Sequence, residues 1–420
     1  MTAEQNQYQK ECEGENMYKD YRGTHGVDLK VNVCGVEFPN PLILASGPET
    51  DSAEKVLHAF ECGWGGAILK TVAMDLNAHT NVTPRFNTVK INGRTAGFAN
   101  MEVSSTHDLE WWAEVVHRIK REYPDRPIFA SIMRTSNRNE DDWIRAAKVF
   151  TEAGVDGFEL NFSCSHAFHA AGGGASIGKD PAATEMITRW VRSATDKPII
   201  AKLPSITSYI WDVAAAAMRG GADGITAINS VPGISGFNLD TMEPYPNVEG
   251  FSSFTGYSGQ AIKPIALRCV GEILTRMDVP VIGCGGMWNW QDCIEFVLMG
   301  CYAAQLCTAP MFKGFAMAEN LIEGMSKYLA DKGFHSLDEI RGEGLKRFMD
   351  HGDLPRDHKI QAHVDSEKCR GCEICFHACQ DGTGNAIEMR DGKAFVTERC
   401  IGCGLCPLVC PAGCITLEHK

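Results

Sequence analysis

The chain has 420 residues, of which 44% are hydrophobic, and its formal net charge is −13. This length exceeds what one compact domain usually holds, so it predicts two domains or one large one. The acidic balance and the lack of a block of Lys and Arg argue against a nucleic-acid-binding protein.

The N-terminal segment, residues 1–24, is polar throughout. It lacks the apolar core of a secretory signal. No part of the chain approaches the roughly 18 uninterrupted apolar residues that a membrane-spanning helix needs. We therefore expect a cytoplasmic protein with an N-terminal arm that is loosely ordered or bound to a partner.

Residues 25–345 alternate short apolar runs with amphipathic stretches. Eight runs read as buried strands, at 41–46, 66–70, 128–133, 157–162, 198–203, 224–229, 280–284 and 303–307. Stretches of helical spacing separate and follow them, at 53–62, 108–122, 141–153, 182–195, 209–219, 261–277, 289–299 and 314–330. Strand-then-helix units in this number predict an α/β fold, a parallel sheet closed as a (β/α)8 TIM barrel. A doubly wound open sheet is the alternative.

Polar residues stand at the ends of the predicted strands, where barrels of this kind carry their chemistry. The candidates are Ser46, Lys70, Thr71, Arg134, Asn161, Cys164, Lys202, Asn229, Ser230, Gly285, Gly286 and Thr308. Any one of them is also explained by a strand end that reaches solvent. The two lysines are harder to explain as packing, because a buried Lys needs a partner.

The C-terminal region, residues 364–420, carries nine of the 18 cysteines, and eight of these form two runs of the pattern CxxCxxCxxxC. In two-cluster ferredoxins each [4Fe–4S] cluster takes four thiolates, and the fourth cysteine of each run ligates the other cluster. One predicted cluster therefore takes Cys369, Cys372, Cys375 and Cys410. The other takes Cys400, Cys403, Cys406 and Cys379. Cys414 is left over.

Zinc knuckles are the alternative for these cysteines, but they usually pair two short CxxC units across a long spacer. Gln380 follows the first run where Pro often stands, and this removes no ligand. Between the runs, residues 386–397 predict two short strands around a turn at Asp391-Gly392. This is typical of a small ferredoxin-like α+β domain, which we expect to be joined to the barrel by a linker at 346–363.

The loops after the seventh and eighth barrel strands often bind phosphate. Gly285-Gly286 and Cys307-Thr308 fall in these loops, and glycines let backbone N–H groups approach an anion closely. No GxGxxG motif follows a strand, and the glycine run at 172–178 lacks the spacing and the strand of a dinucleotide site. A barrel joined to two [4Fe–4S] clusters thus indicates FMN, with no site for FAD or NAD(P)H.

Three segments carry a resemblance: ELNFSCSH (159–166), TAINSV (226–231) and SGQAIKPIALR (258–268). Together with the two cysteine runs they resemble dihydropyrimidine dehydrogenases. The length and the order of the domains are similar to PreA-type catalytic subunits of the bacterial NAD-dependent enzyme, over nearly the whole chain after about residue 28. The barrel is also similar to that of dihydroorotate dehydrogenases.

The resemblance implies a role for each matching position. Flavin contacts are implied for Ala45, Ser46, Lys70, Thr71 and Lys202. Ribityl and phosphate contacts are implied for Ser258, Gly259, Gly285, Gly286, Cys307 and Thr308. Pyrimidine contacts are implied for Asn100, Asn161, His166, Asn229 and Ser230. Cys164 matches the catalytic acid.

The implied reaction is reduction of the 5,6-double bond of uracil or thymine, with a hydride from FMN and a proton from Cys164 on the opposite face. Amides of Asn offer both a donor and an acceptor for the pyrimidine edge. Electrons would come from NADH through a PreT-like iron–sulfur flavoprotein subunit that binds FAD and NADH. The clusters would relay them, in a hetero-oligomer.

Three features depart from the family pattern. Ser165 stands where Pro is usual, and the glycine-rich loop at 167–178, with an additional His169, predicts a mobile lid. Arg134 ends the third strand, where it either faces a substrate carboxylate or forms a salt bridge outside the pocket. The substrate therefore stays open. The same machinery acting on orotate or dihydroorotate is one alternative, and an electron-transfer subunit without its own substrate is another.

Overall fold

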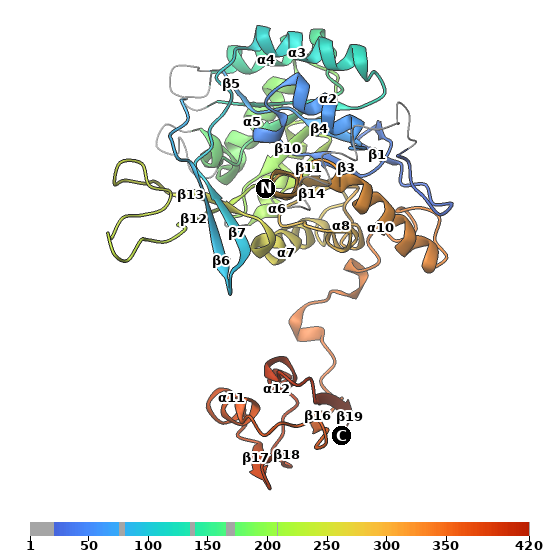
Figure 1. The fold of residues 1–420 in the computed structure, drawn as a ribbon. Helices are drawn as coiled ribbons and strands as arrows, with labels where there is room; N and C mark the ends of the chain where they lie inside the picture. Colours follow the sequence, from blue (N-terminus) through green and yellow to red (C-terminus); the bar gives the residue numbers. More distant parts are fainter. Residues whose placement is uncertain (1–20, 75–79, 135–138, 165–172, 208, 420) are drawn as a thin grey trace. The chain divides into compact units, whose positions relative to one another are not determined.

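A computed structural model describes residues 21–74, 80–134, 139–164, 173–207 and 209–419. The chain divides into two units, Met1–Arg347 and Phe348–Lys420, which we describe separately (Figure 1). Among the described residues, no helix is long and apolar enough to cross a membrane.

The first unit is built on eight parallel strands that close into a ring. They are β3 (Leu42–Leu44), β4 (Gly66–Ile68), β8 (Ile128–Met133), β9 (Gly157–Asn161), β10 (Ile199–Leu203), β11 (Gly224–Ala227), β14 (Val281–Cys284) and β15 (Ala303–Leu306). β4 pairs with β8 as well as with β3, and this pairing closes the sheet. The predicted TIM barrel is confirmed, and the open doubly wound sheet is excluded. A short strand, β5 (Val72–Ala73), extends beside β8.

Helices follow the barrel strands in the predicted order. They are α2 (Ala53–Glu61), α3 (Leu109–Glu122), α4 (Glu140–Ala153), α5 (Pro181–Arg192), α6 (Ile210–Arg219), α7 (Lys263–Leu274), α8 (Trp290–Leu298), α9 (Thr308–Lys313) and α10 (Met317–Asp331). Helix α3 shows why they form. The Asp108 side chain accepts a hydrogen bond from the Trp111 N–H as an N-cap, and Trp112, Val116 and Ile119 bury one face.

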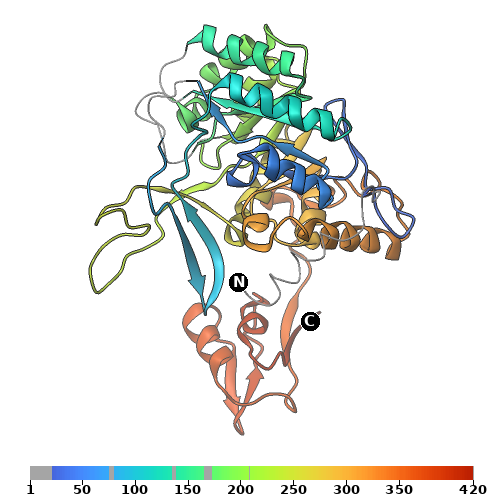
Figure 2. The same ribbon diagram turned by 45° about the horizontal axis from the view of Figure 1, so that its top comes forward.

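An antiparallel sheet of four strands, absent from the prediction, lies at the mouth of the barrel. Its order is β12 (Val231–Gly233), β13 (Thr255–Ser258), β7 (Arg94–Asn100) and β6 (Phe86–Ile91). Figure 2 shows β6 and β7 projecting from the barrel as a hairpin. The hairpin turns at Asn92-Gly93, where φ is 50° and 77°. Asn-Gly is a strong sequence signal for a hairpin turn, so this turn can be predicted from the sequence.

The last residues of the predicted N-terminal arm contact the barrel. The Tyr21 hydroxyl donates to the Glu61 carbonyl at 2.9 Å, and the Thr24 N–H donates to Ser326 Oγ at 3.1 Å. A short hairpin follows, formed by β1 (Val31–Val33) and β2 (Val36–Phe38). Residues 1–20 of the arm lie outside the described residues.

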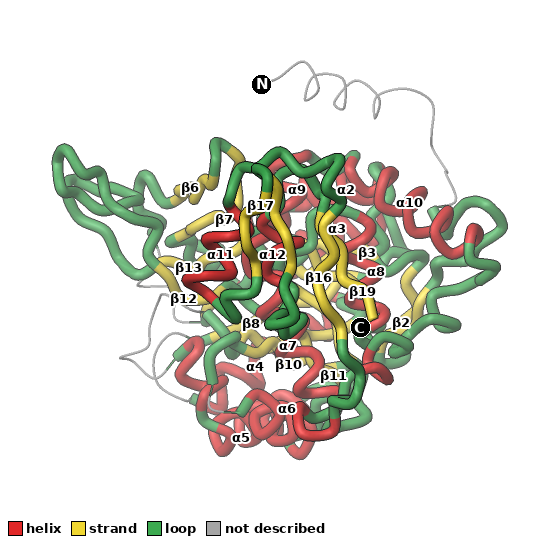
Figure 3. The backbone as a smooth tube through the Cα atoms, turned by 90° about the horizontal axis from the view of Figure 1, so that it is seen from below, coloured by secondary structure: helices red, strands yellow, loops and turns green. Residues whose placement is uncertain are grey.

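The second unit contains two antiparallel strand pairs and two short helices. β16 (Ile360–Val364) pairs with β19 (Ile415–His419), and β17 (Ile387–Arg390) pairs with β18 (Lys393–Val396). The helices are α11 (Ile374–Gly382) and α12 (Leu405–Val409), which lie beside each other (Figure 3). The predicted hairpin at Asp391-Gly392 is confirmed. β16 begins inside the segment expected as a linker, so that segment contributes a strand to the ferredoxin-like module.

Candidate active site and cluster module

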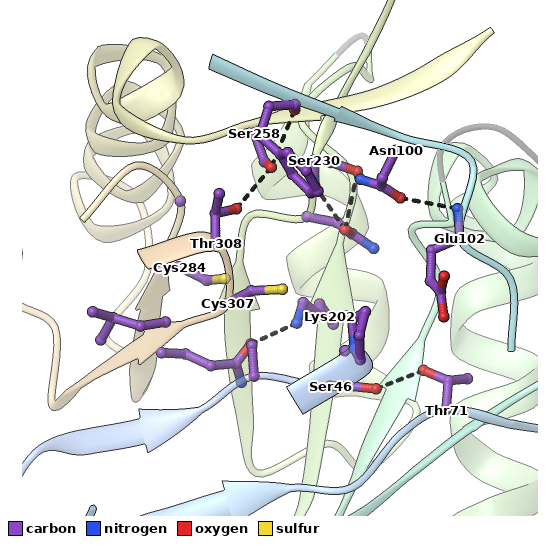
Figure 4. A pocket seen from close by; sticks show the side chains of 18 of the residues that line it. Ser46, Thr71, Asn100, Glu102, Lys202, Ser230, Ser258, Cys284, Cys307 and Thr308 are labelled. Atoms are coloured by element: carbon purple, nitrogen blue, oxygen red, sulfur yellow. Dashed lines mark hydrogen bonds between the residues drawn. The ribbon is translucent and has the colours of Figure 1, made fainter. Parts of the chain in front are cut away.

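A cavity of about 1060 Å³, its open mouth included, lies at the C-terminal ends of the barrel strands. Every residue for which we predicted flavin, substrate or catalytic contact, and which the structure describes, lines this cavity (Figure 4). His166 lies outside the described residues. With the open mouth counted, the volume slightly exceeds the roughly 300–1,000 Å³ typical of small-molecule sites, so the cavity has the size of a small-molecule site.

Lys202 forms a buried network at the bottom of the cavity. Its Nζ lies 3.2 Å from Glu159 Oε1 and donates to Gln305 Oε1 at 2.5 Å. Gln305 and Thr226 in turn donate to Glu159 Oε2, at 2.7 and 2.9 Å. Burial lowers the pKa of Lys202, but the charge of Glu159 outweighs it and raises the pKa above the usual value. Lys202 therefore presents a permanent positive charge to the cavity.

Lys70 lies at the end of β4 and is held by a residue that we did not predict. Its Nζ donates to Glu102 Oε1 at 2.6 Å, and Arg85 pairs with the same carboxylate. Burial raises the pKa of Glu102, but Lys70 and Arg85 outweigh it and hold the pKa below the usual value. Glu102 lines the cavity and is thus an ionised acceptor beside Asn100.

Asn161 and Asn229 belong to a chain of hydrogen bonds that orients both amides. Asn161 Nδ2 donates to Thr71 Oγ1 at 3.0 Å, and the Ser163 hydroxyl donates to Asn161 Oδ1 at 3.1 Å. Asn229 Nδ2 donates to Ser163 Oγ at 2.9 Å, and the Ser230 N–H donates to Asn229 Oδ1 at 2.7 Å. An amide carries two N–H donors. These contacts among described residues leave one N–H of each amide for a ligand.

The additional sheet supplies two further polar groups to the cavity. Asn100 Nδ2 donates to the Gly256 carbonyl at 3.0 Å, and the Glu102 N–H donates to Asn100 Oδ1 at 3.3 Å. Ser258 Oγ and Thr308 Oγ1 lie 2.8 Å apart, which joins β13 to the start of α9 (Figure 4). Asn100 keeps one donor and one acceptor beyond these contacts.

Cys164 follows β9 and lines the cavity. Its carbonyl accepts a hydrogen bond from the Ala175 N–H at 3.1 Å, and the Gly178 N–H donates to the Phe162 carbonyl at 3.1 Å. Gly174, Ala175, Ile177 and Gly178 are buried. The second half of the predicted lid, residues 173–178, is thus packed on the barrel, because its backbone hydrogen bonds return to the β9 loop. Residues 165–172, with Ser165 and His169, lie outside the described residues.

Arg134 forms an ion pair with Asp142 of α4. It is buried, and it is not among the described residues that line the cavity. Of the two interpretations drawn from the sequence, the structure supports the salt bridge. Asp142 lies in the first turn of α4, so the cation serves the junction between β8 and this helix.

Two glycines at the cavity have backbone conformations that suit close approach to an anion. Gly259 and Gly286 have φ of 84° and 81°, where side chains other than Gly are strained. A Cβ on Gly286 would lie 2.4 Å from the backbone nitrogen of Lys263. The loop after β14 therefore packs against the start of α7 with no room for a side chain, and its backbone faces the cavity.

The eight predicted cluster ligands form two groups in the second unit. Cys379, Cys400, Cys403 and Cys406 line one cavity of about 380 Å³, its open side included. Burial raises the pKa of Cys375, and the neighbouring Cys369, Cys410 and Cys372 add to this, so these four thiols lie near one another. Each group contains the fourth cysteine of the other run.

Backbone N–H groups surround these sulfur atoms, as thiolate ligands require. The Ala362 N–H lies 3.4 Å from Cys400 Sγ, and the Ala386 N–H lies 3.2 Å from Cys379 Sγ. Backbone N–H groups, first that of Ala394, lower the pKa of Cys369. The module thus fits two [4Fe–4S] clusters.

Comparison with protein families matches both units. Residues 28–329 match the dihydroorotate dehydrogenase family, and residues 362–417 match the 4Fe–4S dicluster domain. The chain belongs to the dihydroorotate dehydrogenase family. Membership implies a flavin in the barrel, and the dicluster domain implies two [4Fe–4S] clusters in place of zinc.

Similar proteins share both parts or the barrel alone. The NAD-dependent dihydropyrimidine dehydrogenase subunit PreA of Escherichia coli (strain K12) is 39% identical over 403 residues, 93% of this chain and 95% of the relative. The chloroplastic dihydropyrimidine dehydrogenase (NADP(+)) of Arabidopsis thaliana is 34% identical over 384 residues, 88% of each chain. The catalytic subunit of dihydroorotate dehydrogenase B (NAD(+)) of Pyrococcus abyssi is 36% identical over 320 residues, 76% of this chain and 99% of the relative. The chain is thus a dihydropyrimidine dehydrogenase-like oxidoreductase, which confirms the resemblance found in the sequence.

Sequence reasoning missed several cavity residues, of which Glu102, Gln305 and Cys284 are examples. It also missed Glu159, the partner of Lys202. Gln305 and Glu159 interrupt apolar strand runs, and a polar residue inside such a run is a usable signal because its burial needs a partner. Glu102 follows strand β7 of the additional sheet. Because the sequence did not predict this sheet, it gave no reason to expect Glu102 at the cavity.

Proposed function

We propose that this chain is the catalytic subunit of an NAD-dependent dihydropyrimidine dehydrogenase that reduces the 5,6-double bond of uracil or thymine. The observation that carries the proposal is the convergence of three Asn amides and Cys164 on one cavity that also holds two buried lysines. PreA, 39% identical to this chain, bears this activity in its name.

The cavity's hydrogen-bonding pattern suits a pyrimidine. Asn161 and Asn229 each present one N–H, and these would bind the two ring carbonyl groups. Asn100 presents one donor and one acceptor, so it would bind an adjacent N–H and C=O edge. Ser230 completes this side of the cavity. Binding by fixed amides orients the ring before the chemical step, which lowers the entropic part of the barrier.

We infer that FMN is the flavin. When bound, it supplies the hydride for the substrate. Lys202 and Lys70 would lie along its ring with Ala45, Ser46 and Thr71, where a fixed positive charge favours the reduced form. Ser258, Gly259, Gly285, Gly286, Cys307 and Thr308 would hold the ribityl chain and the phosphate. The crowded Gly286 backbone and the two hydroxyl groups at Ser258 and Thr308 fit this part.

Cys164 would donate the proton to the substrate carbon opposite the hydride. A protonated thiol can act as a general acid. His166 would contact the substrate from the same loop. The Ala175 N–H holds the Cys164 carbonyl, which fixes the backbone from which the thiol reaches the cavity.

The two clusters would relay electrons from a PreT-like flavoprotein partner that binds FAD and NADH. In the sequence of this chain, no dinucleotide fingerprint follows a strand, so a partner that takes electrons from NADH is expected. Such a relay needs a second subunit, so it predicts a hetero-oligomer. In it, the cluster module would carry electrons from the partner to the flavin.

Turnover assays test the proposal. Flavin- and cluster-loaded protein should reduce uracil and thymine when driven by dithionite or by the partner with NADH, and the Cys164→Ala variant should lose this by about 100-fold or more. Orotate is the alternative substrate to test, because the Pyrococcus relative is named for dihydroorotate. Turnover of orotate with none of uracil or thymine would reassign the substrate. Full activity of Cys164→Ala would favour an electron-transfer subunit.

A further inference from the structure

Glu49 is a buried acid that the proposed function does not use. It lies in the turn η1 (Pro48–Thr50) after β3 and is 5% exposed. Both carboxylate oxygens are shielded from solvent, and the Cys307 thiol lies beside them as a hydrogen-bond donor, but no cation pairs with them among the described residues. Such a group is uncommon, because transfer of an unpaired carboxylate out of water is strongly unfavourable.

The Glu49 carboxyl lies directly behind the floor of the cavity. A Cβ on Gly47 would lie 2.3 Å from Glu49 Oε2 and 2.9 Å from Cys307 Sγ. Gly47 and Cys307 both line the cavity. The Glu49 carboxyl therefore lies next to two residues, Gly47 and Cys307, that line the space we assign to the flavin.

The cations near Glu49 are already paired with other carboxylates. Lys70 lies 2.6 Å from Glu102, and Lys202 lies 3.2 Å from Glu159. Glu49 forms no salt bridge of its own within the part of the chain that the structure describes. The titratable groups that face it from the surrounding strand ends are Lys70, Lys202, Cys284 and Cys307.

Glu49 is the member of this cluster whose charge changes near neutral pH. Burial raises its pKa to about 7, and Cys307, with the two lysines, offsets this only in part. Burial also raises the pKa of Cys284 to about 11 and that of Cys307 well above its usual value. Both thiols therefore stay protonated, and Lys202, whose pKa is raised, stays charged while Glu49 titrates.

We propose that Glu49 takes up one proton when the flavin in this cavity is reduced, so that the charge of the site stays constant. The inference rests on the proposed function in that a flavin must occupy the cavity. The flavin accepts two electrons from the relay and one proton from solvent, and so gains one negative charge. The Glu49 carboxylate binds a second solvent proton and loses one negative charge. Its O–H is the only bond formed on the protein.

The proposal predicts a change in the pH dependence of the flavin's reduction potential. Where Glu49 is already protonated in the oxidised enzyme, reduction takes up one proton per two electrons. Where Glu49 is ionised, above pH about 7, reduction takes up two. For a two-electron couple each proton changes the potential by about 30 mV per tenfold change in proton concentration. The slope should therefore double above neutral pH.

Spectroelectrochemical titration of the full chain, loaded with flavin and clusters, tests this between about pH 6 and pH 9. The flavin absorbance is followed in the wild type, in Glu49→Gln and in the control Glu54→Gln. Glu54 is an exposed carboxylate in the first turn of α2, so its loss makes the same change in net charge. We expect the doubled slope in the wild type and in Glu54→Gln, and the one-proton slope throughout in Glu49→Gln.

A one-proton slope in the wild type, or a doubled slope that persists in Glu49→Gln, would overturn the proposal. If Glu49→Gln does not fold, an indicator dye measures proton uptake by the wild type at about pH 8, where two protons per flavin are expected and one would refute the idea. Uracil and thymine turnover is measured on the same samples. If the slopes are as expected but neither uracil nor thymine is turned over, this inference stands and the substrate assignment is wrong. If the protein does not bind flavin, both this inference and the proposed function are wrong.

Discussion

Lys202 and Glu159 are charged residues on the neighbouring, mostly apolar strands β10 and β9, and each explains the burial of the other. Removing both charges from water is unfavourable, and their attraction compensates only because Gln305 and Thr226 complete the hydrogen bonds. The pair therefore contributes little net stability. It holds a positive charge at a fixed place in the wall of the cavity.

Replacing one member of this pair should be more harmful than replacing both. Lys202→Met leaves Glu159 buried without its cation, so we expect the free energy of unfolding to fall by about 3–5 kcal/mol. The double variant Lys202→Met/Glu159→Gln removes both charges and should recover much of this loss. Urea unfolding of the full chain without cofactors measures it. Equal stability of the single and double variants would contradict the pairing.

At the scale of elements, the loops after the last barrel strands and the additional sheet define the upper walls of the cavity. Gly286 lies where the loop after β14 meets α7, and Ser258 ends β13. The hairpin β6–β7 brings Asn100 opposite Gly256. Segments distant in the sequence thus contribute neighbouring polar groups to one wall.

Gly286 and Gly314 form a matched pair for testing whether the loop after β14 helps to bind the phosphate of FMN. Their φ values are 81° and 79°, so an Ala at either position adopts a strained backbone conformation. Only Gly286 also faces a close backbone neighbour, whereas a Cβ on Gly314 meets nothing within 4 Å. We expect Gly286→Ala to lose FMN retention and Gly314→Ala to keep it. Flavin content after gel filtration measures this, and equal retention would refute the assignment.

The module makes an element-scale prediction of its own, because each predicted set of cluster ligands includes cysteines of both runs. Cys379→Ala and Cys403→Ala should each remove the same cluster, so combining them should lose no more iron than either alone. Cys379→Ala combined with Cys372→Ala should remove both clusters. Iron per chain after anaerobic reconstitution gives the count. Additive loss in the first double variant would mean that each run holds its own cluster.

At the scale of the whole molecule, the chain joins a barrel that holds the candidate substrate site to a module that holds the cluster ligands. The Pyrococcus dihydroorotate dehydrogenase B subunit matches 76% of this chain and 99% of its own length. The full-length match to PreA includes the module. The arrangement is consistent with a catalytic unit whose electrons arrive through the module.

A ligand variant of the module should separate electron delivery from chemistry. Cys372→Ala should abolish turnover that is driven by NADH and the flavoprotein partner, because the relay is broken. It should leave most of the turnover that is driven by dithionite, since a small reductant reaches the flavin directly. Parallel assays with uracil compare the two. Loss of both activities with flavin still bound would argue against a relay role.

The sequence by itself determined the eight-stranded barrel and the two cysteine runs, which rest on apolar runs of strand length and on fixed cysteine spacing. Polar residues at the strand ends pointed to part of the cavity lining, whereas Asn100 and Ser258 were named only through the family resemblance. Tertiary structure alone decided the additional sheet, the ion pair of Arg134 with Asp142, and the partners of Lys202 and Lys70. It also decided the place of Glu49 behind the cavity floor. These depend on which distant segments meet, and a buried charge takes its meaning from the partner that faces it.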